Sequence, residues 1–156
     1  MAILTQAVII LKLDYCNSVY YGCQKSVINQ LQTVQNRACR VIFGLIRKSP
    51  IESKLKELHW LKIMERIEYK YTLLVYKTVN GLSPSYLKDL IFFNNVTGSR
   101  SISLHIPDPH SKNIRAFQIA APSIWNNLPS PIKESENIKS FKKNLKTFLF
   151  KKSYDQ

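Results

Sequence analysis

The segment from Ile63 to Val79 is the most strongly patterned part of the sequence. Apolar side chains recur there with the period of an α-helix, while charged ones mostly fall on other faces. The apolar stripe consists of Ile63, Ile67, Tyr71 and Leu74, and Met64 and Val75 widen it. Gly81 then suits the left-handed residue after a helix, and Pro84 suits the first turn of the next one. The sequence therefore predicts an amphipathic helix over 63–79, a sharp stop, and a short second helix over 83–91.

Helical periodicity also marks most of the remaining chain. We expect helices at Ala2–Leu13, Ser26–Gly44, Glu52–Leu58, Pro122–Leu128 and Ser135–Lys151. The last helix has a clear apolar stripe, made of Ile138, Phe141, Leu145, Phe148 and Leu149. Between the helices, Trp60 is expected in the core, and His59 is expected to be a structural, hydrogen-bonded histidine near it.

One region departs from helical spacing. Ile102, Leu104 and Ile106 alternate with polar residues, which predicts a short strand that ends at Pro107. Ile114 to Ile119 is its candidate antiparallel partner. The predicted fold class is therefore mainly α: a single domain over residues 1–156, of about six amphipathic helices, with a loop and small β-hairpin insertion at 94–119.

The helix expected at 26–44 has two different faces. Its apolar stripe is Ile28, Leu31, Val34, Ala38 and Val41 or Ile42, and Gly44 sits where a C-terminal glycine belongs. Arg37 and Arg40 fall on the other side. This pattern is typical of a helix that packs on a core and exposes a solvated face, and it would also suit a helix that contacts nucleic acid.

The chain is strongly basic. It carries 23 lysines and arginines against 10 acidic residues, for a net charge of +13. A charge of this size favours binding to polyanions, with nucleic acid as the first candidate and an anionic membrane as the second. The alternative is a basic surface that serves only solubility.

Cysteine usage points to a reducing compartment. The three cysteines, Cys16, Cys23 and Cys39, form no Cys-x-x-Cys pair, and we expect them to pack as small hydrophobic residues. The apolar run Ala2–Leu11 has no preceding positive charge, no cleavage site follows it, and it is too short to span a bilayer. We therefore expect a protein of the nucleus or cytoplasm that is not secreted and has no membrane partner.

No catalytic centre is visible in the sequence. Polymerisation requires clustered carboxylates that hold two metal ions, but the aspartates at 14, 89, 108 and 155 are widely separated. The segment His105–His110 combines two histidines and one aspartate, which could ligate a metal, although its two prolines favour an extended turn. We expect no catalytic residue, no metal and no cofactor.

Several short sequence motifs, spread over most of the chain, can be compared with those of known families. They are Leu13–Ser18, Leu31–Ala38, Leu58–Leu61, Arg66–Lys70, Leu74–Lys77, Gly81–Leu87, Arg115–Phe117 and Ala120–Pro129. Together they resemble the C-terminal region of the open reading frames of LINE-type (Jockey-like) non-LTR retrotransposons, essentially end to end. In that family the region lies downstream of the reverse-transcriptase catalytic core. The resemblance thus implies a non-catalytic fragment of a larger RNA-directed DNA polymerase.

The resemblance and the charge together predict a basic module that helps a polymerase to hold RNA or DNA. The candidate contacts to the nucleic-acid backbone are Arg37, Arg40, Arg47, Lys48, Lys142, Lys143 and Lys146. A solvated lysine face is the alternative for the last three. Tyr69 and Tyr76 are candidates for stacking on bases, with core packing as the alternative for at least one of them.

A second hypothesis is a structural or protein-interaction module that docks on an upstream reverse-transcriptase core. Such a module would expose a sizeable apolar patch where it meets its partner. The apolar run Ala2–Leu11 is the expected place for this patch.

Overall fold

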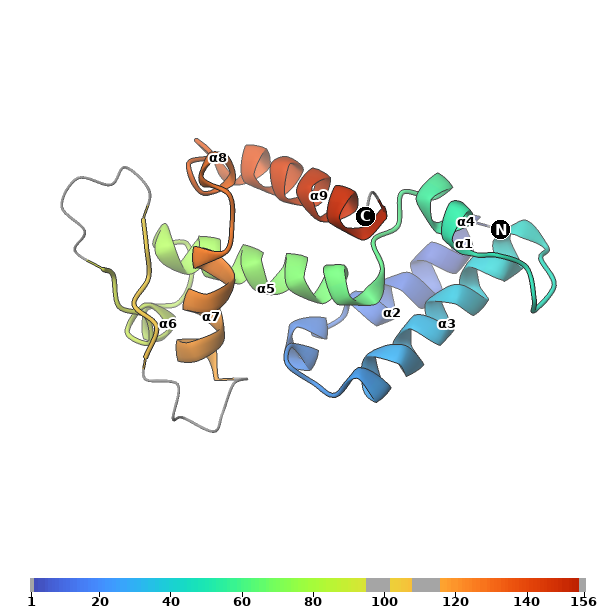
Figure 1. The fold of residues 1–156 in the computed structure, drawn as a ribbon, viewed down its shortest axis with the longest axis horizontal. Coiled ribbons are helices and arrows are strands. Elements are labelled where there is room, and N and C mark those ends of the chain that lie inside the picture. Colours follow the sequence, from blue (N-terminus) through green and yellow to red (C-terminus); the bar gives the residue numbers. More distant parts are fainter. Residues whose placement is uncertain (1, 95–101, 108–115, 155–156) are drawn as a thin grey trace. The chain divides into compact units, whose positions relative to one another are not determined.

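The computed structural model describes residues 2–94, 102–107 and 116–154, and these form a mainly helical protein (Figure 1). The helical elements are α1 (Ala2–Thr5), the π-helical η1 (Gln6–Ile10), α2 (Leu11–Asp14), the 3-10 helix η2 (Asn17–Tyr20), α3 (Lys25–Phe43), α4 (Glu52–Glu57), α5 (Ile63–Val79), α6 (Ser85–Lys88), α7 (Phe117–Asn126), α8 (Ser130–Lys133) and α9 (Ile138–Tyr154). The predicted mainly α class is confirmed. The helix expected at 63–79 has the predicted bounds.

The backbone divides into two compact units. The first unit comprises Met1–Glu68 and Leu149–Gln156, and the second unit comprises Tyr69–Phe148. The divisions fall inside α5 and α9, so each of these helices contributes residues to both units.

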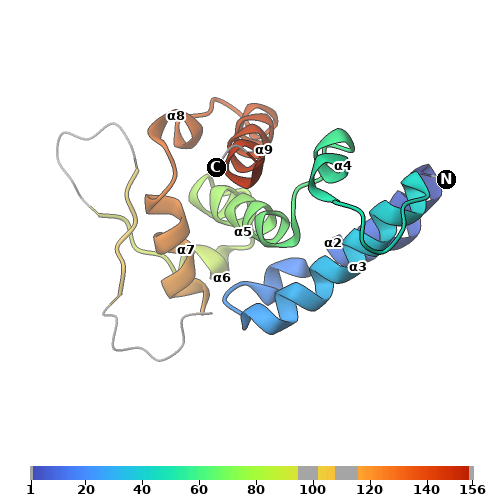
Figure 2. The ribbon, with the colours of Figure 1, turned by 45° about the vertical axis from the view of Figure 1, so that its right-hand side comes forward.

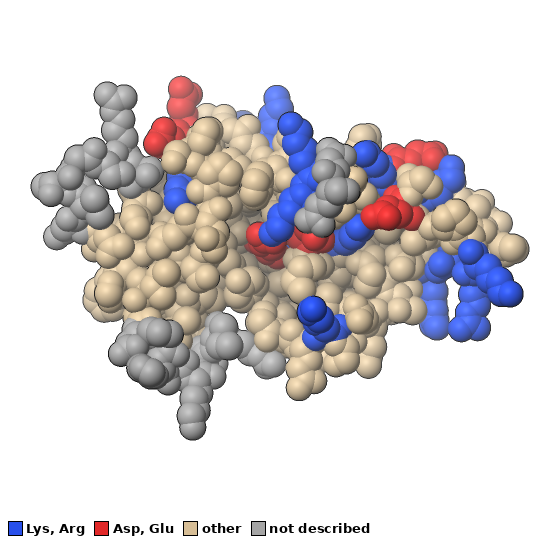
Figure 3. Space-filling view, viewed as in Figure 1, with Lys and Arg blue, Asp and Glu red and all other residues tan. Residues whose placement is uncertain are grey.

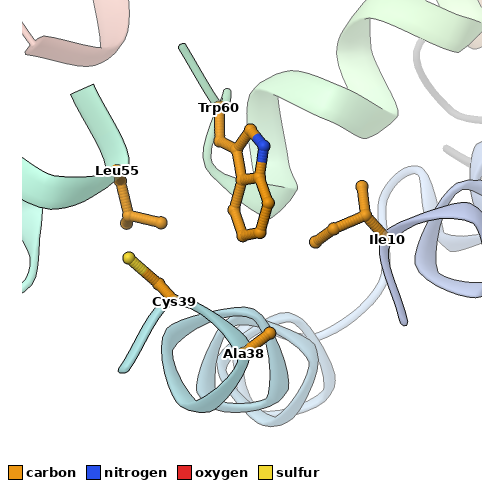
Figure 4. Close-up of a cluster of buried hydrophobic side chains, with 5 residues drawn as sticks. All are labelled: Ile10, Ala38, Cys39, Leu55 and Trp60. Carbon is orange, nitrogen blue, oxygen red and sulfur yellow. The ribbon is translucent and has the colours of Figure 1, made fainter. Parts of the chain in front are cut away.

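The first unit is built around an apolar cluster on the inner face of α3. Figure 4 shows its buried members, Ile10 from η1, Ala38 and Cys39 from α3, Leu55 from α4, and Trp60. The N-terminal helices run alongside α3 in both ribbon views (Figure 1 and Figure 2). Burial of Trp60 confirms its predicted place in the core.

A polar network replaces part of the apolar stripe that was predicted for α3. Gln35 is fully buried, and its Nε2 donates to the carbonyl oxygen of Leu61 at 2.8 Å. Gln32 accepts a hydrogen bond from the backbone N–H of Ile63 at 2.9 Å, at the start of α5. The predicted core position of Val34 was wrong, because the helix turns these amides inward and leaves Val34 exposed. Of the two alternatives for the end of the stripe, Val41 is exposed, whereas Ile42 packs against the apolar cluster.

The end of α9 is fastened within the first unit. The hydroxyl of Tyr154 donates to the carbonyl oxygen of Trp60 at 2.5 Å, and the ammonium of Lys62 donates to the carbonyl oxygen of Ser153 at 3.0 Å. Lys152 forms an ion pair with Glu68 at 2.8 Å. The bond from Lys62 satisfies one of the carbonyl groups of the last turn of α9, which lack partners within the helix, and the other two contacts hold side chains of that turn.

Aromatic packing organises the second unit. The ring of Tyr76 stacks on Phe141 with a centroid distance of 3.8 Å and lies tilted against Trp125 at 6.5 Å. Phe141, Leu145 and Leu149 of α9 are fully buried, which confirms the centre of the apolar stripe that was predicted for this helix.

The predicted β-hairpin was wrong in the described residues. Leu104 forms an isolated antiparallel bridge with Phe93, whereas the expected partner segment already enters α7 at Phe117. The side chain of Asn126, at the end of α7, exchanges two hydrogen bonds with the backbone of Leu104, at 2.9 and 2.7 Å. These bonds occupy the groups that a second strand would have used. Residues 95–101 and 108–115, which include the other parts of the predicted insertion, lie outside the described residues.

Two single-residue predictions were also wrong. His59 is exposed, has a positive φ of 52° and places its ring 5.8 Å from that of Phe150. Cys16 is exposed, whereas Cys39 is buried as expected and Cys23 is half-buried. All three thiols are free.

Candidate nucleic-acid interface

A hollow beside the C-terminal half of α3 brings three of the predicted contact residues together. Arg37, Arg40 and Arg47 line it, and its volume is about 640 Å³. The other lining residues are Thr33, Asn36, Val41 and Leu45. Figure 3 shows lysine and arginine side chains where Figure 1 draws this half of α3 and the loop after it. The whole hollow lies within the first unit.

Helix periodicity and a glycine-ended turn together position the three arginines. Arg37 and Arg40 are three residues apart on α3, so they share one face of the helix. Gly44 then takes the left-handed conformation, with φ of 62°, and the N–H of Leu45 donates back to the carbonyl oxygen of Arg40 at 3.0 Å. This ending resembles a Schellman motif and turns the chain sharply. The turn brings Arg47 to the same hollow as the helix arginines.

The charged residues that line the hollow are all positive. None of the described residues that line it is acidic. Among the described residues, the Nε of Arg40 is buried and has no hydrogen-bond partner. A buried donor without an acceptor is unfavourable, because it has lost water and gained no bond in return. The hollow therefore combines a triple positive charge with an unsatisfied donor.

Among the polar side chains of the hollow, Asn36 leaves donors free and Thr33 leaves an acceptor free. The Oδ1 of Asn36 accepts a hydrogen bond from Gln32 at 2.9 Å, so the outer part of the Asn36 amide is its NH₂ group. The hydroxyl of Thr33 donates to the carbonyl oxygen of Asn29 at 2.8 Å, which leaves its oxygen lone pairs available. Val41, which is exposed, and Leu45, which is half-buried, supply an apolar wall. This combination suits a ligand that is rich in acceptors and has an apolar part.

Several other cations of the first unit are paired with acidic residues. Their ion pairs are Lys54–Glu57, Lys62–Glu52, Arg66–Asp14 and Lys152–Glu68. The contact between Arg66 and Asp14 is bidentate, with Nε to Oδ1 at 2.8 Å and a second bond at 2.5 Å. These pairs serve the fold, and they set the arginines of the hollow apart as cations that face no carboxylate within it.

The remaining predicted contact residues lie elsewhere. Lys48 is exposed but does not line the hollow. Lys142, Lys143 and Lys146 are exposed on α9 and belong to the second unit. The predicted cations thus divide between the two units.

The two predicted stacking tyrosines differ in their surroundings. Tyr76 is only 3% exposed and its ring is held between neighbouring aromatic rings, so the prediction that it stacks on bases is corrected to a core role. Tyr69 is half-buried, and burial raises the pKa of its hydroxyl above the ordinary value. For Tyr69 the stacking role stays a prediction.

Sequence reasoning missed four of the residues that line the hollow. Thr33 and Asn36 share a helix face with Arg37 and Arg40, at spacings of three and four residues, so helical geometry alone would have found them. Val41 was one of two alternatives for the core-facing stripe, the other being Ile42. Leu45 follows the helix, and its place depends on the turn at Gly44, which the spacing of helical residues does not describe.

Comparison with known proteins gives no relative for this chain: no family model, curated protein or solved structure matches it. None of the described helices is both long enough and apolar enough to cross a bilayer. Within the described ranges, no group of three or more His, Cys, Asp or Glu side chains is placed to hold a metal ion. Of the segment 105–110, the structure describes only the part up to Pro107.

Proposed function

We propose that this chain is a non-catalytic nucleic-acid-binding module from the C-terminal region of a LINE-type reverse transcriptase. The observation that carries the proposal is the convergence of Arg37, Arg40 and Arg47 on one hollow without a described carboxylate. Arginine presents a planar fork of donors that matches phosphate oxygens. In this role the module binds the backbone of RNA or DNA and leaves polymerisation to another part of the polypeptide.

The charge balance supports the same role. The net charge is +13, and several of the few acidic residues are already paired with particular lysines and arginines of the fold. Further positive charge lies at exposed positions, among them Arg37, Arg47 and Lys142. The three free cysteines are consistent with a reducing compartment, the nucleus or cytoplasm, in which a retroelement polymerase would bind its nucleic acids.

A salt titration tests the proposal. Fluorescence anisotropy of the full chain with labelled single-stranded RNA and with duplex DNA should give affinities that fall linearly with salt concentration on a log-log plot. The slope should correspond to several phosphate contacts. Arg37→Gln should reduce its magnitude by about one, because one phosphate contact is lost.

The control is Lys12→Gln, which removes one exposed charge of the same unit away from the hollow. It should change the slope less than Arg37→Gln does. Absence of binding to both nucleic acids at low salt would contradict the proposal.

An exposed apolar stripe favours a second candidate, a module that docks on a reverse-transcriptase core. Leu4, Val8, Leu11, Tyr15 and Val19 are all exposed, at intervals of three or four residues along the N-terminal segment. Tyr15 is 80% exposed. Leu4, Val8 and Leu11 lie within the run Ala2–Leu11, where the docking hypothesis expects an apolar patch, and exposed apolar patches are typical of contact sites.

The docking hypothesis is tested by the association state of the purified chain. Light scattering should show concentration-dependent self-association through the uncovered stripe, and the double variant Leu11→Gln with Tyr15→Gln should remain monomeric. Leu82→Gln, which changes an exposed leucine of the second unit, is the control and should behave as the parent chain does. A parent chain that is monomeric at all concentrations would count against the stripe as a contact surface.

A further inference from the structure

We propose that the hollow beside α3 is a seat for one phosphate group, with Arg40 as its central ligand. The inference rests on the proposed function, because it names the chemical group through which that function would act. It goes further in assigning one residue and one atom, the Nε of Arg40, to the recognition of phosphate.

The first argument concerns the unpaired donor. The Nε of Arg40 is buried and has no partner among the described residues, although this side chain lines an open hollow. A phosphate oxygen that accepts from Nε and a second that accepts from a terminal guanidinium nitrogen would form a bidentate contact. Binding would thus satisfy a donor that the free protein leaves without an acceptor, once a change of the side-chain rotamer turns Nε toward the hollow.

The second argument concerns the surroundings of Arg40. Arg37 and Arg47 add two further guanidinium groups around the same space. The Asn36 amide keeps its NH₂ group outward, because its oxygen is bonded to Gln32. A ligand in the hollow meets mainly donors, and a phosphate group offers only acceptors and negative charge. A cationic ligand would meet three positive charges there.

The third argument concerns size and the apolar wall. A volume of about 640 Å³ exceeds what a lone phosphate needs and lies within the range of about 300–1,000 Å³ that ligand sites occupy. Val41 and Leu45 line the same hollow and present apolar surface to whatever carries the phosphate. A sugar attached to the phosphate fits this arrangement. The phosphate can belong to the interior of a strand or to its end.

The test compares Arg40→Lys with the parent chain. Lysine keeps the positive charge but lacks the planar fork, so a purely electrostatic role predicts unchanged oligonucleotide binding. A phosphate seat predicts at least a tenfold loss of affinity at every salt concentration. The control Lys12→Gln removes an exposed charge of the same unit outside the hollow, and it should lower the affinity only at low salt.

Inorganic phosphate is the second probe. Compared with chloride at equal ionic strength, it should displace a labelled oligonucleotide from the parent chain and from Lys12→Gln, but not from Arg40→Lys. It should also raise the melting temperature of the parent chain, which verifies binding without any oligonucleotide. Circular dichroism of Arg40→Lys checks that the variant is folded, and Arg37→Lys provides a second fork-removing variant at an exposed position.

Two oligonucleotide arms identify the source of the phosphate. Tighter binding of a 5′-phosphorylated strand than of its 5′-hydroxyl twin assigns the seat to a terminal phosphate, and equal binding assigns it to internal phosphodiesters. Binding that is the same in Arg40→Lys and the parent chain, with phosphate no better than chloride, would overturn the seat and leave the proposed function standing. Stabilisation by phosphate that depends on Arg40, without any oligonucleotide binding, would support the seat and overturn the proposed function.

Discussion

Gln35 shows how a single polar residue can direct the packing of a helix. It is fully buried, donates to the carbonyl oxygen of Leu61 at 2.8 Å, and accepts a hydrogen bond from Gln32 at 2.9 Å. A buried amide is tolerated only when its hydrogen bonds are made, so α3 turns the face that carries Gln35 toward the start of α5. Because the face with Gln35 is buried, the opposite face of α3 points outward, and this outward face lines the hollow.

Replacement of Gln35 by alanine should therefore lower the free energy of unfolding by about 1–3 kcal/mol, since the carbonyl group of Leu61 stays buried without its donor. Urea denaturation followed by circular dichroism measures this value. Gln30→Ala, at an exposed position of the same helix, should change stability by less than about 0.5 kcal/mol. Equal effects of the two substitutions would show that the buried hydrogen bond contributes nothing.

Tyr154 makes stability depend on alkaline pH. Burial, followed by the nearby carboxylates of Glu65 and Glu52, raises the pKa of its hydroxyl above the ordinary value of 10.0. The folded state therefore holds this proton more tightly than the unfolded state does. The contribution of Tyr154 is fully present below the ordinary pKa and is lost as the pH rises through and beyond it, because the unfolded state ionises first.

The variant Tyr154→Phe tests this. At neutral pH it should be less stable than the parent chain by about 0.5–1.5 kcal/mol, since the hydrogen bond to Trp60 is lost. Above about pH 10 the difference should narrow. Urea denaturation across an alkaline pH series measures it, and Tyr86→Phe, at an exposed tyrosine, is the control. A difference that does not change with pH would contradict the assignment.

At the scale of elements, the end of α3 decides whether the arginines meet. Gly44 and Gly81 follow α3 and α5, with φ of 62° and 69°, and a Cβ at either position would meet no atom within 4 Å. At both sites there is space for a side chain, so the left-handed backbone conformation is what disfavours any residue other than glycine. Only the turn at Gly44 leads into Leu45 and Arg47 of the hollow.

Gly44→Ala and Gly81→Ala should each cost about 1–2 kcal/mol of stability, because alanine is strained in the left-handed region. Only Gly44→Ala should also weaken oligonucleotide binding, since the strain is relieved by movement of the segment that carries Arg47. Thermal unfolding and anisotropy titrations of the two variants provide the comparison. Equal oligonucleotide affinities for the two variants would argue against a role for this turn in binding.

The elements also differ in how far their sequences predicted them. The bounds of α5 and the buried centre of α9 follow from apolar residues at helical spacing, which is a local property of the chain. Helical spacing did not predict which face of α3 is buried, because the inward residues include amides whose partners are 26 to 31 residues away. The segment around Leu104 alternates like a strand, yet its backbone bonds are made by the side chain of Asn126. A pattern of hydrophobicity contains no information about such a partner.

At the scale of the whole molecule, cations lie on a surface of each unit. The arginines of the hollow belong to the first unit, while Lys142, Lys143 and Lys146 belong to the second. If both surfaces contact one nucleic acid, the phosphate contacts of the two should add. If only the hollow binds, the lysines of α9 form a solvated face.

Lys142→Ala and Lys143→Ala should each reduce the salt slope of oligonucleotide binding by about one, and each should do so to the same extent in the background of Arg37→Gln. The same anisotropy titrations measure these slopes. Ala substitution of Lys88, an exposed lysine on α6, serves as the control for a lost charge in the second unit. Unchanged slopes for both α9 variants would restrict the interface to the first unit.

The sequence by itself determined the mainly helical class, the long helices α5 and α9, the core position of Trp60 and the excess of positive charge. These properties depend on composition and on spacings within one helix, which act over a few residues. Only the tertiary structure decided which face of α3 is buried, which side chain pairs with Leu104, and that Arg47 joins Arg37 and Arg40. These features depend on hydrogen-bond partners and chain reversals that bring together residues far apart in the sequence, and the free energy of burying a polar group is set by the partner that it meets there.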